Sequence, residues 1–127
     1  VFTTLSGAGH PCLESTEFAI AMVDEAGQCV EPSTLIALRR GCKRCILVGD
    51  PKQLSATTFS TAAARTGYSR SLLKRLMHGG HPTILLDTQY RMNPFISAFP
   101  SRMFYQGKLM DGANVSHKTY RPAYIAA

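Results

Sequence analysis

An apolar run that ends in two acids occupies residues 18–25, Phe18-Ala19-Ile20-Ala21-Met22-Val23-Asp24-Glu25. Further short apolar runs, at residues 1–5, 45–48 and 84–86, are also continuous rather than alternating. Continuous runs of this length are typical of strands that are buried on both faces, as in a parallel sheet covered by helices. The sequence therefore predicts that these runs are strands of such a sheet.

Helices are predicted between these strands. The first covers residues 33–40, with Pro32 in its first turn, a basic end, and Gly41 just after its last residue. The second covers residues 70–78, with Ser69 as its N-terminal cap. Strands that alternate with helices predict the α/β class, with right-handed crossovers between the strands.

The pattern changes after residue 86. Pro94 begins a predicted short helix that runs through Phe99, where Pro100 is expected to break it. Residues 105–108 predict a turn, because they contain a glycine between polar residues. A last strand is predicted at residues 120–127.

The composition is that of a globular chain. Of its 127 residues, 45% are hydrophobic and 17% charged, which excludes a disordered or fibrous protein. No apolar run approaches the roughly 18 residues of a membrane helix, so we expect no membrane partner. Fourteen Lys and Arg against eight Asp and Glu give a net charge of +6, which is compatible with an anionic partner.

Acids follow three of the predicted strands, at Asp24-Glu25, Asp50 and Asp87. In a parallel sheet these acids would meet at the carboxyl edge, where open α/β sheets bind ligands. Asp24 can hold Mg²⁺ through water, and Glu25 can orient or deprotonate an attacking water. The alternative for this pair is a helix that begins with acids in its first turn.

A tight turn is predicted after the run at residues 45–48, in Gly49-Asp50-Pro51-Lys52-Gln53. It would place Asp50 and Gln53 beside the same sheet edge, where we expect Asp50 to contact the cofactor. A glutamine there can hydrogen-bond a terminal phosphate or the attacking water without adding negative charge. An ordinary Asp-Pro turn without chemistry is the alternative.

A third candidate segment is Gln89-Tyr90-Arg91-Met92. Arg91 can stabilise charge on a transferred phosphoryl group, and Tyr90 can stack on a base. We expect Gln89 to lie at the cofactor with them. The alternative is a surface arginine beside a tyrosine packed in the core.

Together these segments resemble the ordered motifs of superfamily 1 helicases. Residues 23–28 resemble their motif II, residues 47–54 their motif III, and residues 86–94 the segment that opens their second RecA-like domain. The stretch Thr4-Leu5-Ser6-Gly7-Ala8-Gly9 resembles the nucleic-acid-contacting motif of the senataxin branch, next to the Upf-type helicases. Four motifs in the same order are far more specific than any one of them.

The resemblance implies a RecA-like P-loop NTPase fold with ATP and Mg²⁺ as cofactors. By this resemblance Asp24 would coordinate Mg²⁺ and Glu25 would activate water. Gln53 would sense the γ-phosphate, and Arg91 would reach that phosphate from the second domain. Tyr90 would sit against the adenine.

The resemblance also implies ATP-driven translocation on single-stranded RNA or DNA, with unwinding of duplexes and hybrids. Thr4, Ser6 and Gly7 would contact the phosphodiester backbone. The senataxin branch implies a nuclear location, with the cytoplasm as the alternative.

The sequence departs from the family pattern in several places. Ser55 and Asn93 stand where the family usually has Pro and His. The sequence contains no Gly-x-x-x-x-Gly-Lys-Ser/Thr, the P-loop pattern, and no later arginine motif. We therefore expect an incomplete sheet, with residues 1–87 as the C-terminal half of a first RecA-like domain and residues 88–127 as the start of a second. Upstream and downstream parts of the same motor would be its partners, and the chain alone would be inactive.

Two other functions remain open at this point. The chain could be a motor-dead module that binds nucleic acid or protein through its basic clusters, the densest of which spans residues 39–44. It could also be a zinc-binding domain, an interpretation that depends on Cys42 and Cys45 alone, because Cys12 and Cys29 do not form a second closely spaced pair.

Overall fold

The computed structural model describes residues 1–39 and 41–117. The strand predicted at residues 120–127 and the predicted helix end at Arg40 lie outside them. The chain divides into two compact units, Val1–Thr83 and a second that begins at Ile84. In the described part of the chain, no helix is long and apolar enough to cross a membrane.

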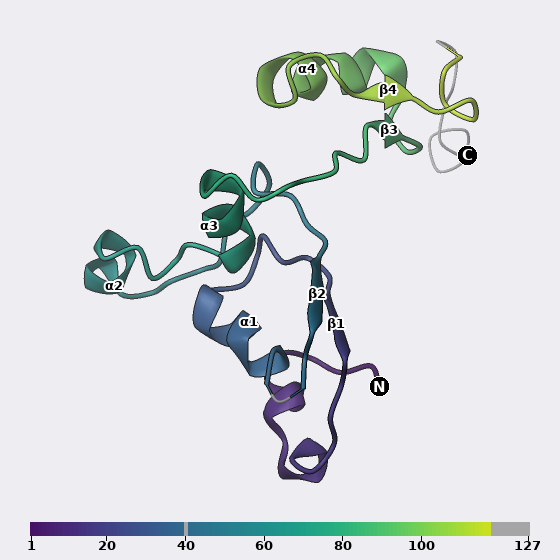
Figure 1. The fold of residues 1–127 in the computed structure, drawn as a ribbon. Coiled ribbons are helices and arrows are strands. Elements are labelled where there is room, and N and C mark those ends of the chain that lie inside the picture. Colours follow the sequence, from purple (N-terminus) through teal and green to yellow (C-terminus); the bar gives the residue numbers. More distant parts are fainter. Residues whose placement is uncertain (40, 118–127) are drawn as a thin grey trace, which may run out of the picture. The chain divides into compact units, whose positions relative to one another are not determined.

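The first unit is built on two parallel strands joined by a helix. Strand β1 (Ile20–Val23) pairs with β2 (Arg44–Leu47), and Val23 lies opposite Leu47. Helix α1 (Glu31–Ala37) connects the two strands and contacts β1 (Figure 1). This arrangement confirms the predicted α/β class with parallel strands, and both strands fall within one or two residues of their predicted positions.

Helix α1 begins as predicted but ends early. Pro32 lies in its first turn, where the missing amide hydrogen costs no hydrogen bond. The amide of Leu38 donates to the carbonyl of Leu35 at 3.1 Å, a tighter bond than that of an α-helix, and this bond closes the last turn at Ala37. The prediction that Gly41 directly follows the helix is therefore wrong, although its φ of +73° is one that glycine favours.

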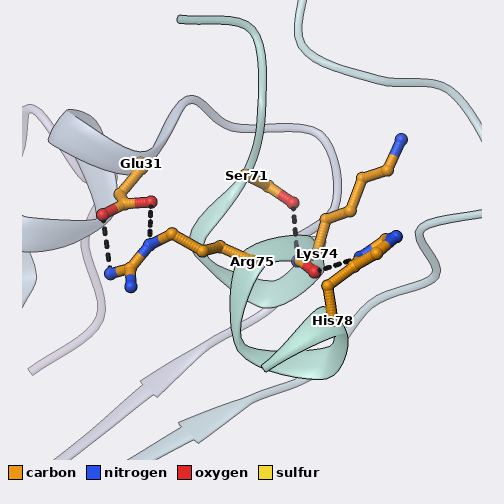
Figure 2. Close-up of polar contacts among 5 residues, drawn as sticks. All are labelled: Glu31, Ser71, Lys74, Arg75 and His78. Carbon is orange, nitrogen blue, oxygen red and sulfur yellow. Dashed lines mark hydrogen bonds and ion pairs between the residues drawn. The ribbon is translucent and has the colours of Figure 1, made fainter. Parts of the chain in front are cut away.

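The second helical region of this unit differs in detail from the prediction. Helix α3 spans Leu72–His78 and is capped by Ser71 rather than Ser69, since the Ser71 hydroxyl accepts the Lys74 amide at 3.1 Å (Figure 2). The preceding residues instead form a turn, in which the Arg70 amide donates to the Gly67 carbonyl at 3.0 Å. A short helix that was not predicted, α2 (Thr61–Arg65), begins at the cap Ser60.

The core of the first unit lies on one face of the strand pair. Val23, Ala26 and Leu73 are buried together, and Leu5, Ala37 and Leu47 pack against them. Ile20 and Met22 of β1 remain 58% and 68% exposed. The prediction of burial on both faces is therefore wrong for β1, because α1 and α3 contribute apolar side chains to one face only.

Two of the predicted strands do not form. Residues 1–5 lead into a turn and a 3₁₀-helix (Gly7–Gly9), followed by a second (Pro11–Leu13). Residues 84–86 have no regular structure, and Ile84 and Leu86 are 92% and 78% exposed. A strand obtains its hydrogen bonds from a neighbouring strand, and within the described residues neither run has one.

The second unit also contains a parallel strand pair. Strand β3 (Thr88–Gln89) pairs with β4 (Met110–Asp111), and helix α4 (Pro94–Phe104) lies between them in the sequence. The predicted turn is confirmed, since the Lys108 amide donates to the Tyr105 carbonyl at 3.0 Å.

The predicted break of α4 at Pro100 is wrong. The helix continues through Pro100 to Phe104. Proline removes one amide donor and its ring crowds the carbonyl four residues earlier, but its φ near −65° is compatible with a helix. Bonds from an amide to the carbonyl four residues earlier occur on both sides of Pro100, since the Ser97 amide donates to the Asn93 carbonyl at 3.0 Å and the Tyr105 amide to the Ser101 carbonyl at 3.1 Å.

An ion pair joins α1 to α3. Arg75 donates from Nε and Nη2 to the two carboxylate oxygens of Glu31, at 2.7 and 2.8 Å (Figure 2). This paired arrangement matches the planar guanidinium to the carboxylate. The hydrogen bonds from Arg75, with a smaller contribution from its charge, lower the pKa of Glu31 below its ordinary value. Both groups are partly exposed, so the pair connects the helices at the surface.

We expect Glu31→Gln to lower the free energy of unfolding at pH 7. Since the folded state lowers the pKa of Glu31, the stabilisation is fully present above the pKa of an unpaired glutamate, about 4.3. It is lost as the pH falls through the lower folded value. Urea unfolding at several pH values should therefore show the variant and the parent converging in acid. Glu17→Gln is the matched control, because Glu17 is exposed and makes no ion pair with the residues described here.

Candidate functional site

The loops that follow β1 and β2 lie against each other. The amide of Val48 donates to the Val23 carbonyl at 2.8 Å, and the Ala26 amide donates to the Val48 carbonyl at 2.8 Å. These bonds extend the pairing of the strands beyond their last residues. Asp24-Glu25 and Asp50 consequently leave the sheet at the same carboxyl edge, as the sequence predicted.

Two glycines allow this close contact. A Cβ at Gly27 would lie 2.8 Å from the carbonyl oxygen of Asp50. A Cβ at Gly49 would lie 2.8 Å from the amide nitrogens of both Ala26 and Gly27. All of these neighbours are backbone atoms and cannot turn aside as a side chain would. Sequence reasoning did not single out either glycine for this role, although each lies in the loop that directly follows a strand.

The loop after β1 holds its two acids in defined positions. The amide of Glu25 donates to Oδ1 of Asp24 at 2.9 Å. Glu25 itself has a φ of +49°, and its Oε2 accepts a hydrogen bond from Nε2 of Gln28 at 2.9 Å. Helix α1 begins only at Glu31, so neither acid lies in its first turn. The alternative interpretation of Asp24-Glu25 as the start of a helix is therefore wrong.

The loop after β2 forms the predicted tight turn. Oδ1 of Asp50 accepts the Lys52 amide at 2.9 Å, and Oδ2 accepts Nε2 of Gln53 at 3.0 Å. Each loop thus contains an acid that is bonded by a glutamine three residues later, Glu25 with Gln28 and Asp50 with Gln53. Gln28 is the member of this set that sequence reasoning missed, and the repeated spacing was the signal that could have found it.

Asp87 does not belong to this edge. Residues 84–86 form no strand, and Asp87 lies in the second unit, directly before β3. Its Oδ1 accepts the hydroxyl of Thr88 at 3.1 Å. The prediction that Asp87 closes a third strand of the same sheet is therefore wrong.

In the second unit, Gln89 orders the loop that carries Tyr90 and Arg91. Its Oε1 accepts the amides of Arg91 and Met92 at 2.9 and 2.7 Å, and its Nε2 donates to the Met92 carbonyl at 2.7 Å. Contact of Gln89 with a cofactor stays a prediction, and the structure gives its side chain a local role. Tyr90 is 64% exposed, so the alternative of a tyrosine packed in the core is wrong.

The candidate nucleic-acid segment forms an ordered turn. Oγ1 and the carbonyl of Thr4 accept the amides of Gly7 and Ala8, at 3.0 and 2.9 Å. Leu5 packs on the core, which attaches the turn to the first unit. The side chains of Thr4 and Ser6 are exposed on it.

The cysteines do not support the zinc interpretation. The Cys42 thiol donates to the Arg44 carbonyl at 3.3 Å, and partial burial, with a smaller effect of Cys42, raises the pKa of the Cys45 thiol. Among the described residues, no three His, Cys, Asp or Glu side chains gather where they could hold a metal.

Comparison with known proteins identifies the family. Two successive family models, both described as an AAA domain, match residues 1–61 and 68–126. The probable helicase MAGATAMA 3 of Arabidopsis thaliana is 49% identical over 95% of this chain, and helicase SEN1 of Saccharomyces cerevisiae is 48% identical over 96%. The ATP-dependent helicase NAM7 of Saccharomyces cerevisiae is 44% identical over 94%. The chain belongs to the superfamily 1 helicases.

The chain spans a small part of these relatives, 15%, 6% and 12% of their respective lengths. The first family model covers Asp24-Glu25, Asp50 and Gln53, and the second covers Tyr90 and Arg91. All candidate residues of the site therefore lie in matched segments.

We expect Gly27→Ala to reduce the free energy of unfolding by about 1–3 kcal/mol, the usual effect of overpacking. The added methyl would force the loop after β1 away from the Asp50 carbonyl. Gly49→Ala should behave alike, whereas Gly79→Ala is the control, because a Cβ there meets only ordinary contacts of 3.4 Å or more. Urea unfolding measures all three, and equal stability of Gly27→Ala and Gly79→Ala would contradict the role of the close approach.

Proposed function

We propose that this chain is part of an ATP-driven motor that translocates on single-stranded RNA or DNA and unwinds duplexes and hybrids. One observation carries the proposal: Asp24-Glu25 and Asp50-Gln53 follow adjacent parallel strands whose ends are hydrogen-bonded to each other. The relatives named as helicases support the motor over a motor-dead binding module.

Glu25 is the residue proposed to activate the attacking water. Gln28 occupies Oε2 of its carboxylate, which leaves Oε1 to accept a proton or a hydrogen bond. A general base needs a fixed orientation, and the bond from Gln28 together with the left-handed backbone at Glu25 supplies it. Gln28 is thus proposed to hold Glu25 in position.

Gln53 is the residue proposed to sense the γ-phosphate. Asp50 accepts one hydrogen of its amide nitrogen, so the orientation of the amide is set by a carboxylate that cannot donate. The second amide hydrogen and the carbonyl oxygen can then meet a phosphate or a water. Asp50 acts in this proposal through Gln53, and its own contact with the cofactor stays a prediction.

The exposed Asp24 fits a Mg²⁺ ion that arrives with a nucleotide. Its Oδ1 accepts the Glu25 amide, and in the part of the chain described here its Oδ2 accepts no hydrogen bond. Mg²⁺ keeps several waters and commonly takes one or two carboxylates plus substrate phosphates, so a cage of protein ligands is not required. When bound, the ion would neutralise charge on the phosphates.

In the second unit, Arg91 is proposed to stabilise charge on the γ-phosphate and Tyr90 to stack on the adenine. Both side chains are exposed and sit on a loop that Gln89 orders. ATP would favour a closed state of the motor through its contacts with both RecA-like domains, and hydrolysis would remove that preference.

The remaining parts of the proposal come from the resemblance. Thr4, Ser6 and Gly7 would contact the phosphodiester backbone from their ordered turn. We assign residues 1–87 to a first RecA-like domain and residues 88–127 to the start of a second; the two compact units divide four residues earlier, between Thr83 and Ile84. A nuclear location is part of the same proposal.

The purified 127-residue chain should release phosphate from ATP no faster than ATP is hydrolysed in buffer without protein. Its sequence holds no P-loop pattern to bind the phosphates, so the candidate residues lack a bound nucleotide to act on. Phosphate release at saturating ATP measures this. Hydrolysis above background that Glu25→Gln abolishes would show that the chain suffices by itself.

In a longer polypeptide that joins this segment to a P-loop, Glu25→Gln should lower kcat for ATP by about 10²–10⁴-fold. The KM should change little, because the substitution removes the base and keeps the shape of the side chain. Arg91→Ala should lower kcat by about 10³-fold. Glu17→Gln is the control, and a wild-type rate in Glu25→Gln would refute the role of the acid.

A further inference from the structure

Residues 111–115, which we name the support segment, lie against the loop that carries Tyr90 and Arg91. It begins in β4, where Asp111 pairs with Gln89 of β3. The amide of Gly112 donates to the Gln89 carbonyl at 2.8 Å, which continues this pairing. Val115 is fully buried, and its amide donates to the Gly112 carbonyl at 3.0 Å, so the segment is anchored at both ends.

Asp111 controls the orientation of the Gln89 amide. Its Oδ1 accepts Nε2 of Gln89 at 2.5 Å and the hydroxyl of the buried Ser97 at 2.7 Å. An ionised carboxylate only accepts hydrogen bonds, so the amide nitrogen of Gln89 must face it. The amide oxygen then faces the opposite way, toward the backbone amides of Arg91 and Met92 that it accepts.

Gly112 provides the space for the Tyr90 ring. A Cβ at Gly112 would overlap ring atoms Cδ1 and Cε1 of Tyr90, so the ring lies directly against the glycine backbone. Asn114 adds a third contact, since its Nδ2 donates to the Tyr90 carbonyl at 3.1 Å. The support segment therefore contacts the loop at the Gln89 side chain, the Tyr90 ring and the Tyr90 backbone.

We propose that the support segment positions Tyr90 and Arg91 for the nucleotide. Asp111 acts through Gln89, Gly112 acts through the ring of Tyr90, and Asn114 acts through the backbone carbonyl of Tyr90. These are positioning residues. The loop geometry stands without any assumption about ATP, whereas its effect on hydrolysis rests on the function proposed above. The first experiment below tests the geometry and the second tests its consequence for hydrolysis.

The first experiment measures amide hydrogen exchange by NMR in the full 127-residue chain. Asp111→Ala should speed exchange at the Met92 amide by about five- to tenfold, the effect of one lost hydrogen bond. Asp111→Asn should speed it less, because its carbonyl oxygen can still accept from Gln89. Asp87→Ala is the matched control, since among the described residues the Asp87 side chain bonds only the Thr88 hydroxyl and the substitution should leave Met92 unchanged.

Unchanged exchange at Met92 in Asp111→Ala would overturn the proposal, and so would equal acceleration in the Ala and Asn variants. If Asp111→Ala does not fold, Asn114→Ala takes its place, because Asn114 is exposed and its loss is not expected to disturb the core. The chemical shifts of the Tyr90 ring should then move, and unmoved shifts would overturn the proposal.

The second experiment measures ATP hydrolysis in the longer polypeptide that includes a P-loop. Asp111→Ala should lower kcat/KM about five- to tenfold, and Asp111→Asn should restore part of it. Combined with Arg91→Ala, the Asp111→Ala substitution should lower kcat no further, because it acts through the residue already removed. Arg102→Ala, exposed on α4, is the control with unchanged activity.

The outcomes separate the two proposals. Suppose that Asp111→Ala speeds exchange at Met92 while Arg91→Ala leaves the rate of ATP hydrolysis unchanged. This outcome would refute the proposed function and leave the positioning of the loop intact. Fully additive losses in the double variant would overturn the action of Asp111 through Arg91, even when each single variant is impaired.

Discussion

The close backbone contact between the loops after β1 and β2 is the constraint on which the first unit depends. Gly27 and Gly49 let the two loops approach to a distance that a side chain would block. The amide of Ala26, in the first loop, donates to the Val48 carbonyl at the start of the second. Ala26 is buried at this contact with Val23 and Leu73. Core packing and the placement of the acids are therefore consequences of the same contact.

In each unit, exposed candidate residues of the site are held by polar side chains nearby. Gln28 holds Glu25, Asp50 holds Gln53, and Gln89 holds the amide of Arg91. In the first two pairs a carboxylate takes part, and a hydrogen bond to a charged group is stronger than one between neutral groups. A site built from short loops can thus be ordered before any ligand binds.

Local signals in the sequence predicted the elements that depend on local physics. The strands β1 and β2, the first turn of α1 with Pro32 and the turn after Tyr105 all follow from apolar runs, proline geometry and glycine placement. Some local signals were misleading, since α1 ends before Gly41, Ser71 rather than Ser69 caps α3, and α4 continues through Pro100. Two strand predictions failed because they required a partner. Residues 1–5 and 84–86 are apolar but unpaired in the described structure. An apolar run does not by itself show which strand it will pair with.

By itself, the sequence determined which groups the candidate site offers: two acids after one strand, an acid and a glutamine after the next, and a tyrosine and an arginine further on. Residue type and spacing are sufficient for that, because they state which groups can ionise, donate or stack. Only the tertiary structure decided which of these groups are held together. The Asp50 carbonyl beside Gly27, and Asp111 facing Gln89, join residues more than twenty positions apart, and contacts of that kind arise from packing rather than from local pattern.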